Sequence, residues 1–203
     1  MKNTIKLTSV LLAMILIFAS LTGCKEVEKS EAAVSGMFTE LKNKNLDGAK
    51  TYLNTDEITI DDNVSDEYIK IAMDLLFDKL DYNIVSAEKI DNNTVIVKTQ
   101  VTALDMKPII SDVFMDLMKF RFSSEYSANM TMEDIQNKVI DILKSSIGEN
   151  SETVTTEVDI KVVKEGKSWK VAGNDELADA VMGKITEATD GLGDILNNFG
   201  SAK

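Results

Sequence analysis

The sequence predicts an α+β domain in which helices precede and follow a curved antiparallel sheet of about four strands. Apolar residues recur with the 3.6-residue period of a helix face up to residue 80, and with the two-residue period of a strand in 82–103 and 154–171. The chain has one proline and no low-complexity linker, which indicates one folding unit. We expect a domain over 28–173 followed by a helical tail over 174–203.

The segment before residue 80 is predicted to form three helices. A first helix over 28–43 presents apolar residues at i, i+3, i+4 and i+7, namely Val34, Met37, Phe38 and Leu41. A short second helix is expected around Leu46, Ala49 and Leu53. The third begins after Ser65, a good N-cap residue, and its apolar face is Ile69, Ala72, Met73, Leu76, Phe77 and Leu80.

Two β-hairpins follow, separated by an inserted helical hairpin over 108–147. In the first, Tyr82, Ile84 and Ser86 are expected on one face, opposite a strand whose inward residues are Val95, Val97, Thr99, Val101 and Ala103. In the second, alternation runs over 154–162 and resumes at Trp169 and Val171. The insertion starts near Pro108, its second helix is capped by Thr131, and the tail aligns Leu177, Val181, Ile185 and Ala188.

Composition excludes several classes of function. The 203 residues include 22 Lys+Arg and 34 Asp+Glu, and removing residues 1–23 takes away Lys2 and Lys6 but no acid, leaving 20 bases, 34 acids and a charge of −14. Such a chain does not suit nucleic acid. Without His and with one Cys, it cannot assemble the usual zinc sites, Cys/His or Ser/His/Asp nucleophiles, or a disulfide framework. We predict a non-enzymatic protein without a metal or cofactor.

Residues 1–23 have the order of a secretory signal: the basic residues Lys2 and Lys6, an apolar run over 10–21, and then the small residue Gly23 where cleavage is expected. The run is too short to span a bilayer, which takes roughly 20 apolar residues. The end of the segment, Leu21-Thr22-Gly23-Cys24, resembles the bacterial lipobox. This resemblance implies that the leader is cut before Cys24, whose thiol carries a lipid that anchors the domain to a membrane.

The lipobox also implies a place in the cell. The anchored protein would lie on the extracytoplasmic face of the cell membrane, held through a short tether over 24–27. Lys25 is not the aspartate associated with inner-membrane retention, and the abundance of Ile, Lys and Asn suggests an AT-rich genome. We therefore expect a membrane of the Gram-positive type.

Two further segments resemble a known fold. The stretch 34–53 is a helix followed by the sequence NLDGAKTYL, and the last hairpin ends in Gly166-Lys167-Ser168-Trp169-Lys170-Val171. Together with the order of elements, they resemble the nuclear transport factor 2-like (cystatin-like) domains of small bacterial lipoproteins, many of which have no assigned function. The resemblance implies a cone whose mouth holds a small molecule or a partner segment, on a scaffold that also serves enzymes.

The inserted hairpin supplies the predicted binding surface. Its apolar residues include Phe114, Met115, Met118, Phe120 and Phe122, which either pack in the core or form a groove for an apolar small molecule, a lipid or a protein segment. Methionine sulfur can also bind cuprous ion, but no His, Cys or Met-x-x-Met repeat reinforces such a site. We favour a binding function at this groove.

Three alternatives remain at this point. An isomerase- or hydrolase-type enzyme would need a carboxylate and a tyrosine in one apolar cavity, drawn from Asp105, Asp112, Tyr52, Tyr68, Tyr82 and Tyr126. The acidic run over 56–67 suggests calcium, although Asp66 stands where an EF-hand-like loop needs Gly, and Ala72 where it needs an acid. The third alternative is an envelope protein–protein interaction module without a pocket.

Overall fold

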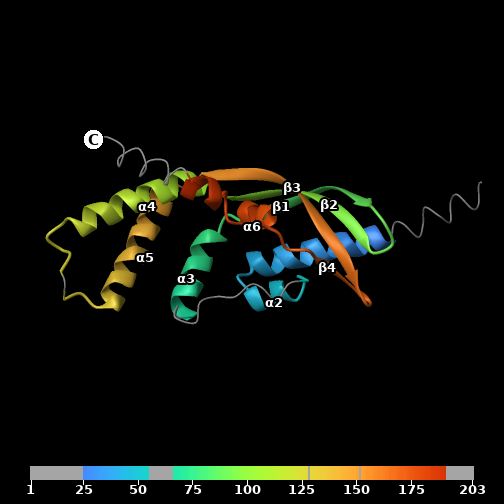
Figure 1. Ribbon diagram of the computed structural model, residues 1–203, viewed down its shortest axis with the longest axis horizontal. Helices are drawn as coiled ribbons and strands as arrows, with labels where there is room; N and C mark the ends of the chain where they lie inside the picture. Colours follow the sequence, from blue (N-terminus) through green and yellow to red (C-terminus); the bar gives the residue numbers. More distant parts are fainter. Residues whose placement is uncertain (1–24, 55–65, 128, 151, 191–203) are drawn as a thin grey trace, which may run out of the picture.

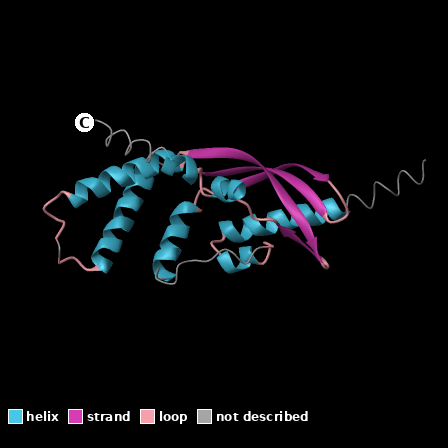
Figure 2. Ribbon diagram, viewed as in Figure 1, coloured by secondary structure: helices cyan, strands magenta, loops and turns pink. Residues whose placement is uncertain are grey.

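The computed structural model describes residues 25–54, 66–127, 129–150 and 152–190 (Figure 1). It confirms the predicted class, because a four-stranded antiparallel sheet is preceded and followed by helices (Figure 2). After the N-terminal helix, described over 25–42, the helices are α2 (Leu46–Lys50), α3 (Asp66–Leu76), α4 (Met106–Arg121), α5 (Met132–Glu149) and α6 (Asp175–Val181). The strands are β1 (Asp81–Lys89), β2 (Thr94–Leu104), β3 (Thr153–Glu165) and β4 (Ser168–Val171).

The sheet has the order β1-β2-β3-β4, and every neighbouring pair is antiparallel. Its inner face is the one that the two-residue period predicts, because alternate residues are buried: Val95, Val97, Thr99, Val101 and Ala103 on β2, and Val158, Ile160 and Val162 on β3. The outer face is polar. There Lys98 Nζ lies 3.1 Å from Glu157 Oε1, and the hydroxyls of Thr102 and Thr155 are 2.8 Å apart.

Strand β1 departs from the predicted alternation. Its register with β2 shifts between Ile84 and Ser86, so Val85 and Ser86 are both exposed. We expected Ser86 to share the face of Tyr82 and Ile84, and this was wrong, because the β-bulge inserts one extra residue into the strand. Beyond the bulge, the half-buried side chains are those of Ala87 and Lys89.

The N-terminal helix packs along the inner face of the sheet. Val34 and Phe38 are fully buried, and the ring of Phe38 stacks on Tyr82 of β1 with centroids 4.8 Å apart. The chain is already helical at residue 25, which is earlier than the predicted range 28–43. Residues 25–27, which we assigned to a tether, therefore belong to the helix, and Val27 packs against the core.

Ion pairs join this helix to both ends of β1. Lys42 Nζ lies 2.7 Å from Asp81 Oδ1 at the start of the strand, and Glu26 pairs with Lys89 at its end. The helix rises about 24 Å from Glu26 to Lys42, and the strand covers about 26 Å between its two partners. Helix and strand are therefore matched in length and antiparallel.

The insertion is a helical hairpin, as predicted. Helix α4 begins two residues before Pro108, because the Asp105 carboxylate accepts a hydrogen bond of 3.0 Å from Lys107 N and caps it. Helix α5 begins with the capping box that we expected at Thr131, whose backbone N donates to Asp134 Oδ2 at 2.9 Å. The hairpin packs on a second, smaller core formed by Leu104, Met106, Ile109 and Ala188.

The tail is part of the fold. Leu177 and Val181 of α6 are buried in the main core, so the domain extends beyond residue 173, where we ended it. A turn at Gly183 follows, with φ of +61°, and a Cβ atom there would collide with the carbonyl oxygen of Leu104. A further helix covers residues 185–190. None of the described helices combines the length and the apolar composition that spanning a bilayer requires.

Acidification should weaken the two ion pairs between the N-terminal helix and β1. The hydrogen bond from Lys89 holds the pKa of Glu26 below its ordinary value of 4.5. That from Lys42 holds the pKa of Asp81 below 3.8. A carboxyl whose pKa is lower in the folded state stabilises the fold above its unfolded pKa, and this contribution is lost as the pH falls through the folded pKa. The free energy of unfolding, measured by urea titration, should therefore fall as the pH drops below about 4.5.

The substitution Glu26→Gln removes one of these two ion pairs and so tests its contribution separately. The variant should be less stable than the parent at neutral pH and should lose less stability on acidification. The control is Glu28→Gln, which removes the same charge from an exposed position in the same helical turn. Equal pH profiles for Glu26→Gln and the parent would contradict the role of this pair.

Candidate functional site

The main candidate site is an apolar cavity of about 480 Å³ between the N-terminal helix, α2 and α6. This volume lies within the range of small-molecule sites, roughly 300–1,000 Å³. Most of the residues around it are apolar: Met37, Leu41, Leu46, Ala49, Leu53, Phe77, Leu177, Ala178, Val181 and Met182. The cavity lies on the inner side of the sheet, beside the main core.

One wall is α2, which is too short to be stable by itself. Asn45 caps it by accepting a hydrogen bond of 3.1 Å from Gly48 N. The chain after it is fixed to β4, because Val171 N donates to Tyr52 O at 2.7 Å and Asn54 N donates to Val171 O at 3.0 Å. Leu53, which we expected in a helix, therefore forms a parallel β-bridge with Val171.

A glycine in the N-terminal helix lets this wall approach closely. A Cβ atom on Gly36 would overlap the ring of Tyr52, so only glycine leaves room for the ring against the helix. Lys170 of β4 reaches the same turn and donates a hydrogen bond to the Thr51 carbonyl. The turn after α2 is thus held by both the helix and the sheet.

The opposite wall is α6. Asn174 caps it, its side-chain oxygen accepting a hydrogen bond of 2.8 Å from Leu177 N. Leu177 and Val181 are buried, whereas Ala178, which lies between them in the sequence, is exposed and lines the cavity. A small side chain at this position keeps the cavity accessible from solvent.

Polar groups of the cavity come from only three side chains. Asn174 and Asp175 are exposed, and Lys50 is half-buried with its Nζ 3.8 Å from Asp47 Oδ1. A cavity of this kind can enclose an apolar body while a polar end of the ligand stays at the mouth near Lys50.

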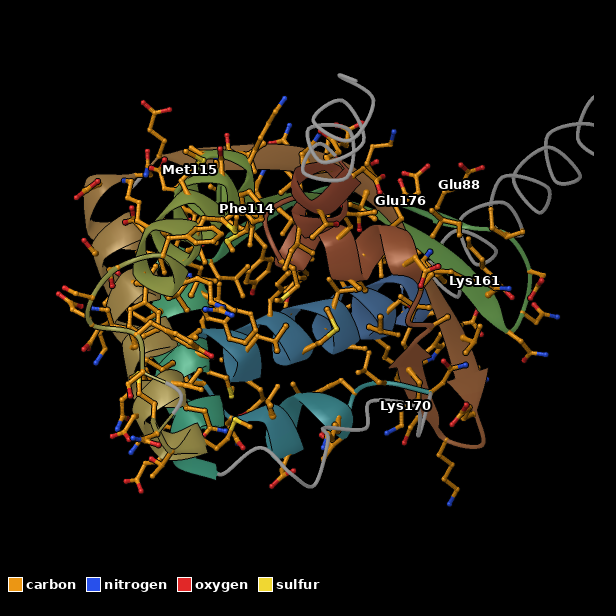
Figure 3. The ribbon with its side chains drawn as sticks, turned by 60° about the vertical axis from the view of Figure 1, so that its left-hand side comes forward. Glu88, Phe114, Met115, Lys161, Lys170 and Glu176 are labelled. Atoms are coloured by element: carbon orange, nitrogen blue, oxygen red, sulfur yellow. The ribbon has the colours of Figure 1, made fainter. Side chains whose placement is uncertain are left out.

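Only some of the residues predicted to form a surface on the inserted hairpin are exposed. Met115, Met118 and Phe122 are exposed by 53%, 40% and 79%, as expected for a groove, and Phe114 is half-buried. Figure 3 shows Phe114 and Met115 on α4, well separated from Glu88 and Lys161 of the sheet. None of the five predicted residues lines the main cavity.

Phe120 packs inside the hairpin and does not belong to the predicted surface. It is buried, and its ring meets the ring of Tyr126 edge-on at 5.7 Å, because α5 and the loop after α4 fold over it. Its edge borders a smaller hollow of about 270 Å³, whose other lining residues include Asp116, Lys119 and Glu125. That hollow is too polar to serve as the expected apolar groove.

None of the described residues considered for catalysis lines the cavity. Tyr82 stacks on Phe38, and Tyr126 lies against Phe120 and beneath Arg121. The carboxylate of Asp105 caps α4, and that of Asp112 accepts a hydrogen bond of 2.6 Å from Asn150. Tyr52 lies over Gly36, and the Tyr68 side chain is outside the described residues. The described candidates therefore bring no Tyr–Asp pair into the cavity.

Several predicted features fall outside the described residues. These are the leader, the lipobox residues Leu21, Thr22 and Gly23 with Cys24, and the acidic side chains over 56–67. Within the described ranges, no three His, Cys, Asp or Glu side chains gather closely enough to hold a metal ion.

Sequence reasoning missed the cavity because most of its apolar residues were already explained as the buried faces of predicted helices. Met37, Leu41 and Phe77 belong to predicted apolar faces, and nothing in their spacing distinguishes a residue that lines a cavity from one that fills the core. One signal was available: Ala178 and Met182 lie beside the predicted apolar row of the tail, which shows that the apolar surface of α6 is wider than one row.

The fold and the cavity together define an α+β domain with an apolar pocket. Comparison of the chain with protein-family models, curated proteins and solved structures gave no match. The resemblance to nuclear transport factor 2-like domains therefore stays a prediction, and function has to be argued from the site itself.

Proposed function

We propose that this chain is a lipoprotein, anchored through a lipid on Cys24 to the extracytoplasmic face of the cell membrane, whose domain binds an apolar small molecule or the apolar part of a lipid. The cavity between the N-terminal helix, α2 and α6 is the observation that carries the binding function. The charge, the apolar run and the lipobox-like motif support the anchor. The nuclear transport factor 2-like resemblance agrees with a small-molecule cavity on such a scaffold.

The lining supports binding more than catalysis. Ten of its fourteen residues are the apolar ones named above, and its single carboxylate, Asp175, is exposed to water. A general base working in an apolar site has its pKa tuned by burial and by a partner. The cavity therefore suits recognition of an apolar body, with no cofactor needed.

The anchor can be tested by intact-mass measurement of the protein isolated from membranes of its own host. The mature chain should begin at Cys24 and carry the mass of two or three acyl chains. The substitution Cys24→Ser should remove the acyl mass and leave the leader uncut, because the acceptor thiol is gone. An unmodified thiol on the parent protein would contradict the proposed anchor.

Ligand binding can be tested by native mass spectrometry of residues 25–203 purified from the host, compared with the same protein after denaturation and refolding. We expect an additional mass that refolding removes. The substitution Ala178→Trp should abolish it, because an indole would enter the cavity from α6, whereas Ala32→Trp, at an exposed position outside the lining, should retain it. A bare polypeptide mass for the parent, or loss in both variants, would contradict binding in this cavity.

A second candidate function is interaction with a protein segment through the inserted hairpin. It is favoured by four large exposed apolar side chains there, those of Met115, Met118, Phe122 and Met132. Exposed apolar clusters of this kind occur at protein–protein interfaces more often than on free surfaces.

A photo-crosslinking residue distinguishes this second candidate. Placed at Met118 in the living host, it should give one defined adduct, and placed at the exposed Lys144 of α5 it should give none. Identical adduct patterns at both positions would indicate random collision and would exclude a specific partner.

A further inference from the structure

The site of lipid attachment is joined to the folded domain without a flexible linker. Lys25, the residue bonded to Cys24, is already helical. The next residues are fixed: Glu26 pairs with Lys89, Val27 packs on the core, and Ser30 is fully buried. Because consecutive Cα atoms are about 3.8 Å apart, the anchor lies within one residue of the rigid part.

The helix begins at one end of the elongated molecule. Figure 1 shows its start beside the turn between β1 and β2, with the turn between β3 and β4 lower at the same end, while the α4–α5 hairpin occupies the opposite end. The Glu26–Lys89 pair and the hydrogen bond of 2.8 Å from Lys164 N to Asn93 O place the same segments together. We call the surface formed by residues 25–29, 88–93 and 164–167 the anchor end.

The anchor end differs in charge from the rest of the chain. It carries five lysines and five carboxylates, so its net charge is zero: Lys25, Lys29, Lys89, Lys164 and Lys167 against Glu26, Glu28, Glu88, Asp91 and Glu165. The mature chain as a whole carries −14, as derived above, and that excess therefore lies entirely outside this end. The end also exposes one large aliphatic side chain, Ile90, by 56%.

We propose that the anchor end lies on the phospholipid headgroups of the membrane that holds the protein. This inference rests on the proposed lipid anchor at Cys24. The N-terminal helix then stands on the membrane, and the α4–α5 hairpin points away from it. The short connection to the lipid restricts the contact to this end, and Ile90 enters the interfacial layer.

Electrostatics selects this orientation over one in which the molecule lies flat. Bacterial membranes of the expected type present anionic lipids, which attract Lys and Arg and repel carboxylates within a Debye length, about 8–10 Å. A flat orientation would bring the acidic remainder of the domain to the surface. When the molecule stands on the anchor end, the surface that faces the headgroups has no net charge and contains five lysines. The excess of carboxylates in the rest of the domain then stays away from the headgroups.

The test uses the full-length lipidated protein in vesicles of phosphatidylglycerol and phosphatidylethanolamine. Cys24 is the only cysteine and its thiol is acylated, so an introduced cysteine is the single reactive thiol. We compare a fluorophore at Asn92→Cys, in the β1–β2 turn, with one at Ser124→Cys, between α4 and α5, using headgroup-labelled lipid as the quencher. We expect severalfold stronger quenching at Asn92.

Paired charge reversals test the headgroup contact itself. Lys29→Glu with Lys167→Glu should lower the quenching at Asn92 in anionic vesicles but not in phosphatidylcholine vesicles. The matched control, Lys107→Glu with Lys144→Glu in the inserted hairpin, makes the same change in total charge and should have no effect. Equal effects of the two pairs would overturn the proposal.

The remaining outcomes separate this inference from the proposed function. Protein that floats with the vesicles but is quenched equally at Asn92 and Ser124, or more strongly at Ser124, is anchored and lies in another orientation, which overturns the inference alone. Protein purified from membranes that carries no lipid and fails to float would overturn the anchor and the inference together.

Discussion

The packing of the N-terminal helix along β1 is the constraint on which the rest of the structure depends. Eighteen helical residues lie along the inner face of the sheet, with an ion pair at each end of β1 and the Phe38–Tyr82 stack between them. Surface ion pairs alone contribute little, so the stability of this packing comes mainly from burial of Val34, Phe38 and their neighbours. The ion pairs set the register, because each unites residues that only one alignment of helix and strand brings together.

The cavity follows from this arrangement. A helix covers only part of the sheet, and the space beside it is closed by α2 and α6, two helices of five and seven residues. These two helices are held in place mainly by other parts of the fold. The turn after α2 packs through Tyr52 against Gly36 and is hydrogen-bonded to the β4 backbone, whereas α6 is held by the burial of Leu177 and Val181. Walls fixed separately to a rigid sheet and helix cannot collapse freely onto one another. An apolar space therefore persists where a simple bundle would have closed it.

Periodicity predicted the elements well and their contacts poorly. Every residue predicted on the apolar faces of the N-terminal helix and β2 is buried, and the alternation of β3 was also predicted, because burial on one side leaves a 3.6- or two-residue period that is visible locally. The β1 bulge and the integration of α6 were missed, since each depends on partners far away in the chain. The same holds for the site: Met37 and Ala178 are more than 140 residues apart in the sequence, and only the fold brings them to one cavity. Methionine-rich composition drew attention to α4 instead, where Phe120 proved to be core.

The inferred orientation also bears on what the cavity can bind. Met37, the first lining residue of the N-terminal helix, lies twelve residues from Lys25 and thus about 18 Å from the start of the helix. If the helix stands on the membrane, the cavity lies in the aqueous space beyond the headgroups. A lipid that remains embedded could not reach it, so its occupant would be a soluble apolar molecule or a lipid already removed from a bilayer. In the same orientation, the exposed methionines of the hairpin lie at the end of the molecule farthest from the membrane.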